Sequence, residues 1–263
     1  MNSKQLQSKI LSWYKVHKRD LPWRKTSDPY KILVSEIMLQ QTQVDRVIPK
    51  YLAFLKAFPS INALASAKTD DVLTLWSGLG YNARAIRLQK TAQVITKDFK
   101  GKFPKDRDVL LTLPGVGPYT ANAVLSFAFN LPFPCIDTNI RRILLHELQL
   151  PESTSITKLY SIAESLIPKN KSCIWHNALM DYGSSVLTAK KTGIKALTKQ
   201  SKFLHSRRWY RGQIMKIVVK EKKISLNKLS KLLKKEKTFL VSILDELQKE
   251  KLVKVVKNQI TLP

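Results

Sequence analysis

Glu36 is a carboxylic acid set in an apolar stretch of the chain, ILVSEIML at residues 32–39. If this stretch is helical, nearly every side of the helix is apolar, so the carboxyl group would lose contact with water and its pKa would rise. A carboxyl group that keeps its proton near neutral pH can act as a general acid. The alternative is a glutamate that faces water or satisfies a helix end, and this stretch alone does not choose between the two.

Asp137 stands directly before the sequence TNIRR at residues 138–142, where a helix is expected to begin. The default role of such an aspartate is to cap the N-terminus of that helix. A carboxylate can also stabilise a positive charge that develops in a reaction. The two roles are compatible, because the geometry of a cap would fix the carboxylate in place.

The segment LPGVGPYTAN, residues 113–122, predicts a tight turn between two helices. Gly115 and Gly117 allow backbone N–H groups to point outward, and Pro118 suits the first residue of the second helix. The N-terminus of that helix would add about half a positive charge, so the turn can hold a phosphate without reading base sequence. The alternative is an ordinary connection between helices.

Lysine and arginine outnumber acidic residues along the whole chain. The 263 residues include 46 Lys and Arg and 19 Asp and Glu, which gives a formal net charge of +27, while 44% of the residues are apolar. This composition excludes a disordered tail, and no apolar run is long enough to span a membrane. The charge favours a polyanionic partner. Because no apolar anchor or lipidation motif accompanies it, we expect nucleic acid and no membrane.

The chain contains two cysteines, Cys135 and Cys173. They are too few for a disulfide framework or for a site of four thiolates, so we expect no redox metal chemistry. Residues 1–20 indicate a basic amphipathic helix and lack the features of a secretion signal. We therefore expect a cytoplasmic, nucleoid-associated location.

Apolar residues recur mostly at spacings of three and four, and only 8 residues are glycine, which predicts an all-α fold. Proline and glycine separate the expected helices from one another. We expect these helices over residues 4–17, 30–43, 45–57, 60–66, 69–75, 82–99, 107–112, 118–129, 138–146, 156–167 and 172–187.

The composition changes near residue 189. Residues 190–263 contain 21 Lys and Arg and 5 acidic residues, a net charge of +16. Three helices, over 209–219, 225–233 and 238–249, and a hairpin of strands 252–256 and 259–262 are expected here. We therefore predict a main domain over 1–189, a basic linker over 190–204 and a small winged-helix-like basic domain over 205–263.

Seven segments of the main domain together form a recognisable pattern. They are LPWR at 21–24, DPY at 28–30, SEIMLQQTQV at 35–44, GLGY at 78–81, LPGVGPYTAN at 113–122, DTNIRR at 137–142 and MDYG at 180–183. In order and spacing, over roughly residues 5–187, the pattern resembles the MutY-type adenine DNA glycosylases of the helix-hairpin-helix superfamily, which also includes endonuclease III. The resemblance implies an all-α, two-lobed fold, with a six-helix lobe at about 22–130 and a second lobe from 1–21 and 131–189.

The resemblance also implies roles for three residues. Glu36 matches the acid that protonates the leaving adenine and handles the incoming water, and Asp137 matches the carboxylate that stabilises the charged sugar. Tyr119 stands where strand-cutting relatives carry a Lys that forms a Schiff base, and a phenol cannot form that imine. We therefore expect a monofunctional enzyme that leaves an abasic site, although Tyr119 could also simply pack between the hairpin helices.

Recognition of DNA is implied for further residues. Extrusion of the target base costs a few kcal/mol, which wedging side chains help to offset, and Gln41 and Tyr81 match the wedge. Trp23, Arg24 and Asp181 match the base pocket; their plainer roles would be core packing for Trp23 and surface ion pairs for the other two. The residues expected to bind DNA phosphates are Gly115, Gly117, Thr120, Arg207, Arg208 and Arg211.

The chain departs from the family in two places. Most members carry four cysteines that ligate an iron-sulfur cluster, but Leu187 stands at the first of these positions, so we expect no iron-sulfur cluster and no other metal site. A monovalent cation bound by the hairpin carbonyls of 113–117 is compatible with the superfamily. Members usually end in a domain that helps to recognise 8-oxoguanine, and the last 60 residues are too few and too helical for that domain.

Three functions remain open from the sequence. The first is removal of adenine mispaired with 8-oxoguanine or guanine from double-stranded DNA by a monomeric enzyme. The second is a thymine glycosylase for T:G mismatches, because relatives with that activity also carry tyrosine and aspartate at the positions of Tyr119 and Asp137. The third is a non-catalytic DNA-binding regulator built around the winged-helix-like domain, against which the intact Glu36 and Asp137 argue.

Overall fold

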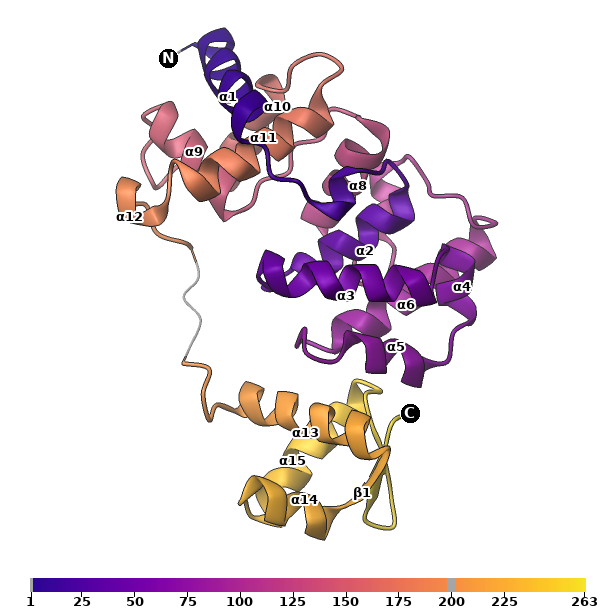
Figure 1. Ribbon diagram of the computed structural model, residues 1–263. Coiled ribbons are helices and arrows are strands. Elements are labelled where there is room, and N and C mark those ends of the chain that lie inside the picture. Colours follow the sequence, from indigo (N-terminus) through magenta and orange to yellow (C-terminus); the bar gives the residue numbers. More distant parts are fainter. Residues whose placement is uncertain (1, 198–201) are drawn as a thin grey trace. The chain divides into compact units, whose positions relative to one another are not determined.

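A computed structural model describes residues 2–197 and 202–263, and most of these residues are helical (Figure 1). None of the helices in these two stretches is both long and apolar enough to cross a lipid bilayer. The helices before residue 198 are α1 (Ser3–His17), α2 (Pro29–Leu39), α3 (Val44–Ala57), α4 (Ile61–Ser66), α5 (Thr69–Trp76), α6 (Ala83–Asp98), α7 (Arg107–Leu111), α8 (Pro118–Phe129), α9 (Thr138–Glu147), α10 (Ile156–Ser165), α11 (Ser172–Ser185) and α12 (Ala189–Thr192).

Residues 202–263, called the C-terminal domain below, contain three helices and a small sheet. Its elements are α13 (Arg207–Glu221), β1 (Lys223–Ser225), α14 (Leu226–Leu233), α15 (Lys237–Lys249), β2 (Lys254–Val256) and β3 (Gln259–Thr261). The antiparallel sheet has the order β1-β3-β2, and Ile224 of β1 pairs with Ile260 of β3, both of them buried. The predicted mostly helical fold with a small C-terminal sheet is confirmed. The sequence did not indicate β1, because its partner strand β3 lies far along the chain, whereas β2 and β3 are joined by a short turn.

Most helices begin and end within two residues of the expected positions, because apolar spacing and the proline and glycine residues between helices are visible in the sequence. Helix α2 differs: it was expected to reach residue 43 but ends at Leu39. Gln41, just beyond this end, has a left-handed backbone with φ of 54°. A short 3-10 helix, Pro22–Arg24, was also not expected. Residues 198–201 of the predicted linker 190–204 lie outside the described residues.

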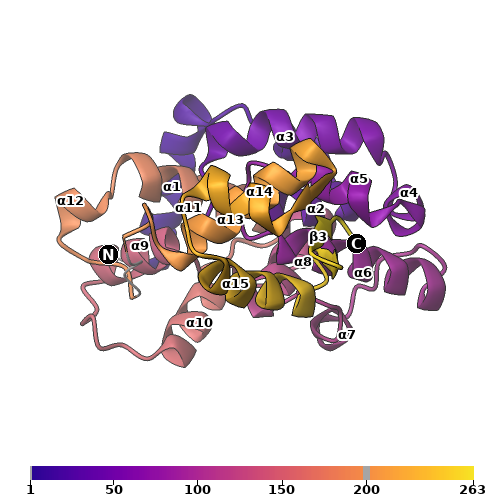
Figure 2. The same ribbon diagram turned by 90° about the horizontal axis from the view of Figure 1, so that it is seen from below.

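The chain divides into two compact units that do not follow its linear order. The first unit contains the described residues of Met1–Glu36 and Pro104–Lys199, and the second contains those of Ile37–Phe103 and Gln200–Pro263. In the first unit α1, α9, α10 and α11 gather around one apolar core (Figures 1 and 2). Leu6 and Ile10 of α1 and Trp175 of α11 are almost fully buried in it, so the first helix of the chain is packed against one of the last helices of this unit.

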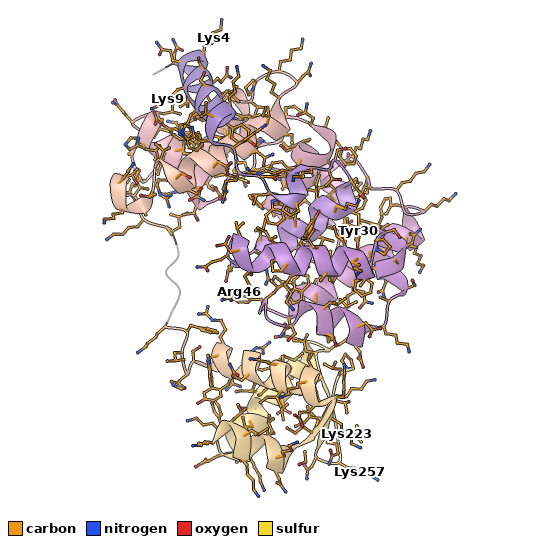
Figure 3. All side chains as sticks on the ribbon, viewed as in Figure 1. Lys4, Lys9, Tyr30, Arg46, Lys223 and Lys257 are labelled. Atoms are coloured by element: carbon orange, nitrogen blue, oxygen red, sulfur yellow. The ribbon has the colours of Figure 1, made fainter. Side chains whose placement is uncertain are left out.

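The second unit combines α3 to α6 with the C-terminal domain. Phe54 of α3 packs edge to face on Trp76 of α5, with their ring centroids 6.0 Å apart, and both rings are fully buried. In the C-terminal domain Ile214 of α13, Leu240 of α15 and Leu229 of α14 are fully buried. Long basic side chains project from its surface, including Lys223 and Lys257 (Figure 3).

Candidate active site

Glu36 lies on α2 in the first unit and is only 7% exposed. Its neighbours on the helix, among them Leu33 and Val34, are buried as well, which leaves the carboxyl group without water to stabilise its charge. This desolvation raises the pKa of Glu36 to about 7, and the negative charge of Asp137 acts in the same direction. A hydrogen bond with Tyr119 and the positive charge of Arg24 act against it. The sequence-based expectation of a desolvated carboxyl group is met at this position.

Tyr119 is the second residue of α8, in the first turn of that helix. Pro118 starts the helix and Gly117 is its N-cap, so the turn before it places the phenol against Glu36. Burial, followed by the charges of Glu36 and Asp137, raises the pKa of Tyr119 well above its usual value. The phenol therefore keeps its proton near neutral pH and donates its hydrogen bond to the Glu36 carboxylate.

Asp137 is the N-cap of α9, as its position before TNIRR predicted. Its Oδ1 atom accepts a hydrogen bond from the Ile140 backbone N–H at 2.7 Å, and its Oδ2 atom accepts one from Asn139 Nδ2 at 3.3 Å. Burial raises the pKa of Asp137, whereas these hydrogen bonds and the charge of Arg142 favour the carboxylate. Glu36, Tyr119 and Asp137 thus lie in one electrostatically coupled group, in which Asp137 has the better support for a negative charge.

Two buried polar residues hold the backbone just before Asp137. Asn122 of α8 donates from Nδ2 to the Pro134 carbonyl oxygen at 2.7 Å, and His176 of α11 accepts from the Cys135 N–H through Nε2 at 3.2 Å. Neither residue was predicted from the sequence. The available signal was their position, because Asn122 and His176 fall among the core-facing residues of helices that are otherwise apolar there.

His176 is a neutral, doubly hydrogen-bonded imidazole. Its Nδ1 lies 2.8 Å from the Ser172 carbonyl oxygen, which can only accept, so Nδ1 carries the proton and Nε2 is the acceptor for Cys135. Nδ1 also lies 2.9 Å from the Ser126 hydroxyl. Burial lowers the pKa of His176 to about 4, and the hydrogen bond to Ser172 only partly offsets that effect. The ring is therefore a structural connection between α8, α11 and the segment before Asp137.

Arg24 and Asp181, expected in the base pocket, form a buried ion pair. Arg24 donates from Nη1 and Nη2 to the two Asp181 carboxylate oxygens at 2.7 and 2.8 Å, and Arg19 Nε donates to Oδ1 at 2.6 Å. Burial opposes ionisation of Asp181, but the hydrogen bonds from Arg24 and Arg19 outweigh it and hold the pKa below its usual value. Asp181 is fully buried and Trp23 is 9% exposed, so neither lies on the surface. A contact of these residues with a base stays a prediction.

The hairpin turns tightly at Gly115, and its binding to phosphate stays a prediction. Gly115 has φ of +80°, a left-handed value that glycine adopts without strain, and the Val116 N–H donates to the Leu113 carbonyl at 3.1 Å. Helix α8 then begins without a side-chain cap at Gly117, so its first N–H groups point to the helix end. The Thr120 side chain is 2% exposed. Any phosphate contact by Thr120 would therefore use its backbone N–H.

Gln41 and Tyr81, the expected wedge residues, lie in the second unit. Both have left-handed backbones, with φ of 54° for Gln41 and 46° for Tyr81, and both side chains are exposed. Such a backbone is strained for residues other than glycine and is found preferentially at functional sites. Neither value could be read from the sequence.

Arg84 of α6 connects the loops that carry these two residues. Its guanidinium donates to the carbonyl oxygens of Ile37, Met38, Gln40, Leu79 and Gly80 and to the Thr42 hydroxyl. Arg84 is 7% exposed, and burial lowers its pKa to about 10. Arg84 was not predicted from the sequence either, although an arginine on the same helix face as buried Leu88 and Ala92 was the available signal.

The three arginines of α13 differ in their contacts. Arg207 and Arg211 form ion pairs with Glu246 of α15 at 2.8 and 2.9 Å, and Arg211 also pairs with Glu250 at 2.7 Å. Arg208 instead donates from Nη1 to the Tyr81 hydroxyl at 2.8 Å. Two of the three predicted phosphate-binding charges are thus already balanced by acidic side chains.

Within residues 2–197 and 202–263, no three His, Cys, Asp or Glu residues lie close enough to hold a metal ion. The two cysteines, Cys135 and Cys173, are both free thiols.

The chain is similar in sequence and in fold to known DNA repair proteins. Residues 34–169 match the family described as HhH-GPD superfamily base excision DNA repair protein. The chain is 36% identical over 228 residues to the adenine DNA glycosylase of Buchnera aphidicola subsp. Schizaphis graminum, covering 84% of this chain and 65% of that protein. It is 42% identical over 186 residues to the adenine DNA glycosylase of Mycolicibacterium smegmatis, covering 69% and 63%. A solved thermostable thymine-DNA glycosylase superposes with a TM-score of 0.67 at 30% identity, covering 72% of this chain and 89% of that one. The chain spans about half to two thirds of the length of the curated relatives it matches.

Proposed function

The chain belongs to the HhH-GPD superfamily of base excision DNA repair proteins, and on this premise we propose that it is a monofunctional DNA glycosylase. Its substrate is adenine mispaired with 8-oxoguanine or guanine in double-stranded DNA, and its reaction is hydrolysis of the N-glycosidic bond. The observation that carries the proposal is the coupled group of Glu36, Tyr119 and Asp137, in which a buried carboxyl group has a pKa of about 7.

Glu36 and Asp137 divide the chemistry between them. Protonated Glu36 donates its proton to a ring nitrogen of the flipped adenine while the bond from the sugar C1′ to the base breaks, and the bonding electrons leave with the base. The Asp137 carboxylate stabilises the positive charge that remains on the sugar. A water molecule then attacks C1′ and gives its proton to the Glu36 carboxylate, which restores the acid. The surroundings of the two carboxyl groups separate their roles. Hydrogen bonds at a helix N-terminus favour the charged form of Asp137, whereas desolvation favours the protonated form of Glu36.

Tyr119 makes the reaction stop at the abasic site. A phenol cannot form the imine through which a strand-cutting glycosylase breaks the DNA backbone. Its hydrogen bond with Glu36 instead orients the acid.

The choice of adenine is supported by the two curated relatives described above, both of which are adenine DNA glycosylases. Removal of thymine from T:G mismatches is the second candidate, supported by the likeness to the solved thymine-DNA glycosylase at 30% identity. A non-catalytic DNA-binding regulator is less consistent with a buried acid whose pKa is near 7.

DNA contacts are proposed for the remaining residues. The hairpin residues Gly115, Gly117 and Thr120 bind phosphate through backbone N–H groups, and Gln41 and Tyr81 enter the duplex. The base pocket is lined by Trp23, Arg24 and Asp181, and phosphates are also bound by Arg207, Arg208 and Arg211.

A monovalent cation could bind at the hairpin carbonyls of 113–117, which supply the oxygen donors that such an ion takes. The Leu113 carbonyl accepts one hydrogen bond there, from Val116, and retains a second lone pair. We also propose that the protein acts as a monomer in the cytoplasm. Its net charge of +27 supports binding to chromosomal DNA, which is a polyanion.

The test uses duplexes with A:8-oxoguanine, A:G, T:G and A:T pairs, incubated with the protein and then treated with alkali to cut abasic sites. Breaks in the adenine strand of the mismatched duplexes, only after alkali, are the expected result. Breaks in the thymine strand of the T:G duplex would establish the second candidate. Strand cutting without alkali would contradict the role given to Tyr119. Binding to the duplexes without any base release would favour the third candidate, a non-catalytic DNA-binding regulator.

A further inference from the structure

Arg208 of the C-terminal domain contacts Tyr81, a residue that precedes it by more than a hundred positions. We propose that Arg208 is a positioning residue for Tyr81, so that the C-terminal domain orients the side chain that enters the duplex. The inference rests on the proposed function of Tyr81. It gives a role to a segment that lies outside residues 34–169, which carry the family match.

The contact has two parts. Arg208 Nη1 donates a hydrogen bond to the Tyr81 hydroxyl at 2.8 Å, and the guanidinium carbon lies 5.8 Å from the centroid of the same ring. On its own domain, the guanidinium lies 5.2 Å from the ring of Phe203. Arg208 therefore makes a hydrogen bond and cation–π contacts with two aromatic rings, and each kind of contact depends on the direction of the guanidinium plane.

Tyr81 is also fixed from the side of its own loop. The guanidinium of Arg84 lies 5.6 Å from the Tyr81 ring centroid, and Arg84 bonds to the carbonyls of Leu79 and Gly80 directly before it. Arg84 thus holds the backbone of Tyr81 and contacts one side of its ring, but 41% of the residue is still exposed. Arg208 supplies the second point of attachment that defines the ring direction.

The surroundings distinguish Arg208 from its neighbours. Arg208 lines a cavity of about 920 Å³ in the second unit, together with Gln41 and Tyr81 and the basic residues Arg46, Arg87 and Lys216 (Figure 3 labels Arg46). Arg207 and Arg211 also line it, but they are ion-paired with α15. Of the three α13 arginines, Arg208 is the one bonded to the expected wedge.

A side chain that enters a base stack binds best if it already points in one direction before the duplex arrives. If the side chain is ordered only on binding, the free-energy cost of ordering it weakens the affinity and slows the reaction. Arg208 pre-orders Tyr81 in this way. A residue that only bound phosphate would instead act independently of Tyr81, and its effect would depend on its charge and on the salt concentration.

The experiment is a double-mutant cycle with the full chain, using Arg208→Met, Tyr81→Ala and the double variant. Two quantities are measured: single-turnover release of adenine from an A:G duplex, and affinity for the same duplex with a tetrahydrofuran abasic analogue in place of the adenosine. We expect Arg208→Met to lower both by about tenfold in the presence of Tyr81, the size expected for a lost hydrogen bond to a charged group. In the Tyr81→Ala background the same change should have almost no effect.

Two further variants separate positioning from charge. Arg208→Lys keeps the positive charge but loses the planar fork, so it should remain close to Arg208→Met. Lys220→Met removes a charge from an exposed position of the same helix and should show the same small loss with and without Tyr81. Thermal unfolding of each variant checks that the C-terminal domain is intact.

Additive losses, or full activity of Arg208→Lys, would overturn the inference and leave Arg208 as a phosphate ligand. The outcome is separable from the proposed function. If the wild-type protein released no base from any duplex, the proposed reaction would be wrong, while the cycle in binding affinity would still measure the coupling. Normal base release with an additive cycle would reject the role of Arg208 alone.

Discussion

The carboxyl group of Glu36 in the first unit and the ring of Tyr81 in the second are prepared by opposite physical means. Glu36 is withdrawn from water, and the loss of solvation changes its chemistry by raising its pKa to about 7. Tyr81 stays exposed on a strained backbone, and cations on either side determine its direction. In the first region burial raises the pKa of a carboxyl group, and in the second region contacts with cations fix the orientation of an aromatic ring.

Both regions nevertheless depend on a buried polar residue that forms hydrogen bonds with backbone groups. His176 holds the segment before Asp137, and Arg84 holds the loops of Gln41 and Tyr81. Because each satisfies backbone groups that would otherwise be unpaired, its loss should cost stability first. The following predictions, in order of decreasing effect, test whether the two regions are as separate as this difference indicates.

The largest effect is expected for Glu36→Gln. The amide cannot donate an acidic proton, so base release should fall by about 10²- to 10⁴-fold, the range for loss of general acid catalysis. Affinity for the duplex with the abasic analogue should stay within about twofold of the wild type, because the wedge of the second unit is unchanged. Single-turnover kinetics and equilibrium binding measure the two quantities.

The matched control for this variant is Glu164→Gln, which makes the same change at an exposed position of α10. It should leave base release unchanged. Unaltered turnover by Glu36→Gln would show that Glu36 is not the acid of the reaction. The contrast between a buried acid in the first unit and an oriented ring in the second would then no longer hold.

Arg84→Met should lower the free energy of unfolding by about 3 kcal/mol, because several buried carbonyl oxygens of two loops lose their donor. Urea unfolding measures this loss, and Thr42→Val, which removes one of the partners, should cost about 1 kcal/mol. DNA affinity should fall with the loops. If Arg84→Met were as stable as the wild type, the hydrogen bonds of Arg84 to the two loops would contribute nothing to the free energy of unfolding.

The rate of base release should decline as pH rises through about 7, because Glu36 must be protonated to act as the acid and its folded pKa is raised to that value. Above the pKa the rate should fall by up to about tenfold per pH unit. Rates at saturating protein over pH 5.5–9 measure the midpoint. Arg208→Met should keep the same midpoint at a lower rate, and a shift of the midpoint in that variant would show that the two regions are coupled.

The smallest effect concerns His176. Its folded pKa is lowered to about 4, so between pH 6.5 and 4 the unfolded chain binds a proton that the folded protein does not. Stability should therefore fall as pH decreases through this window, by up to about 1.4 kcal/mol per pH unit. In His176→Gln this part of the pH dependence should disappear. The exposed His146→Gln serves as the control, and an equal pH dependence in His176→Gln and the wild type would refute the assignment.

Much of the fold was predictable because its signals are local. Apolar spacing and the proline and glycine residues between helices predicted most helices to within about two residues, and Gly115, Gly117 and Pro118 predicted the turn before α8. Where the backbone left its common conformations, prediction failed: α2 ends at Leu39 and Gln41 turns left-handed. No local propensity encodes that turn, because contacts with Arg84 stabilise it from a distant helix.

The candidate acid could be named from the sequence, since ILVSEIML places one carboxyl group among aliphatic neighbours, but this stretch alone did not decide whether Glu36 is buried or faces water. What surrounds that group was decided by the tertiary structure alone. Packing brought Tyr119 and Asp137 within electrostatic reach of Glu36, paired Arg207 and Arg211 with Glu246, and directed Arg208 to Tyr81. Hydrophobic periodicity is a property of neighbouring residues, whereas a pKa or an ion pair depends on which distant side chains fold to within a few ångströms.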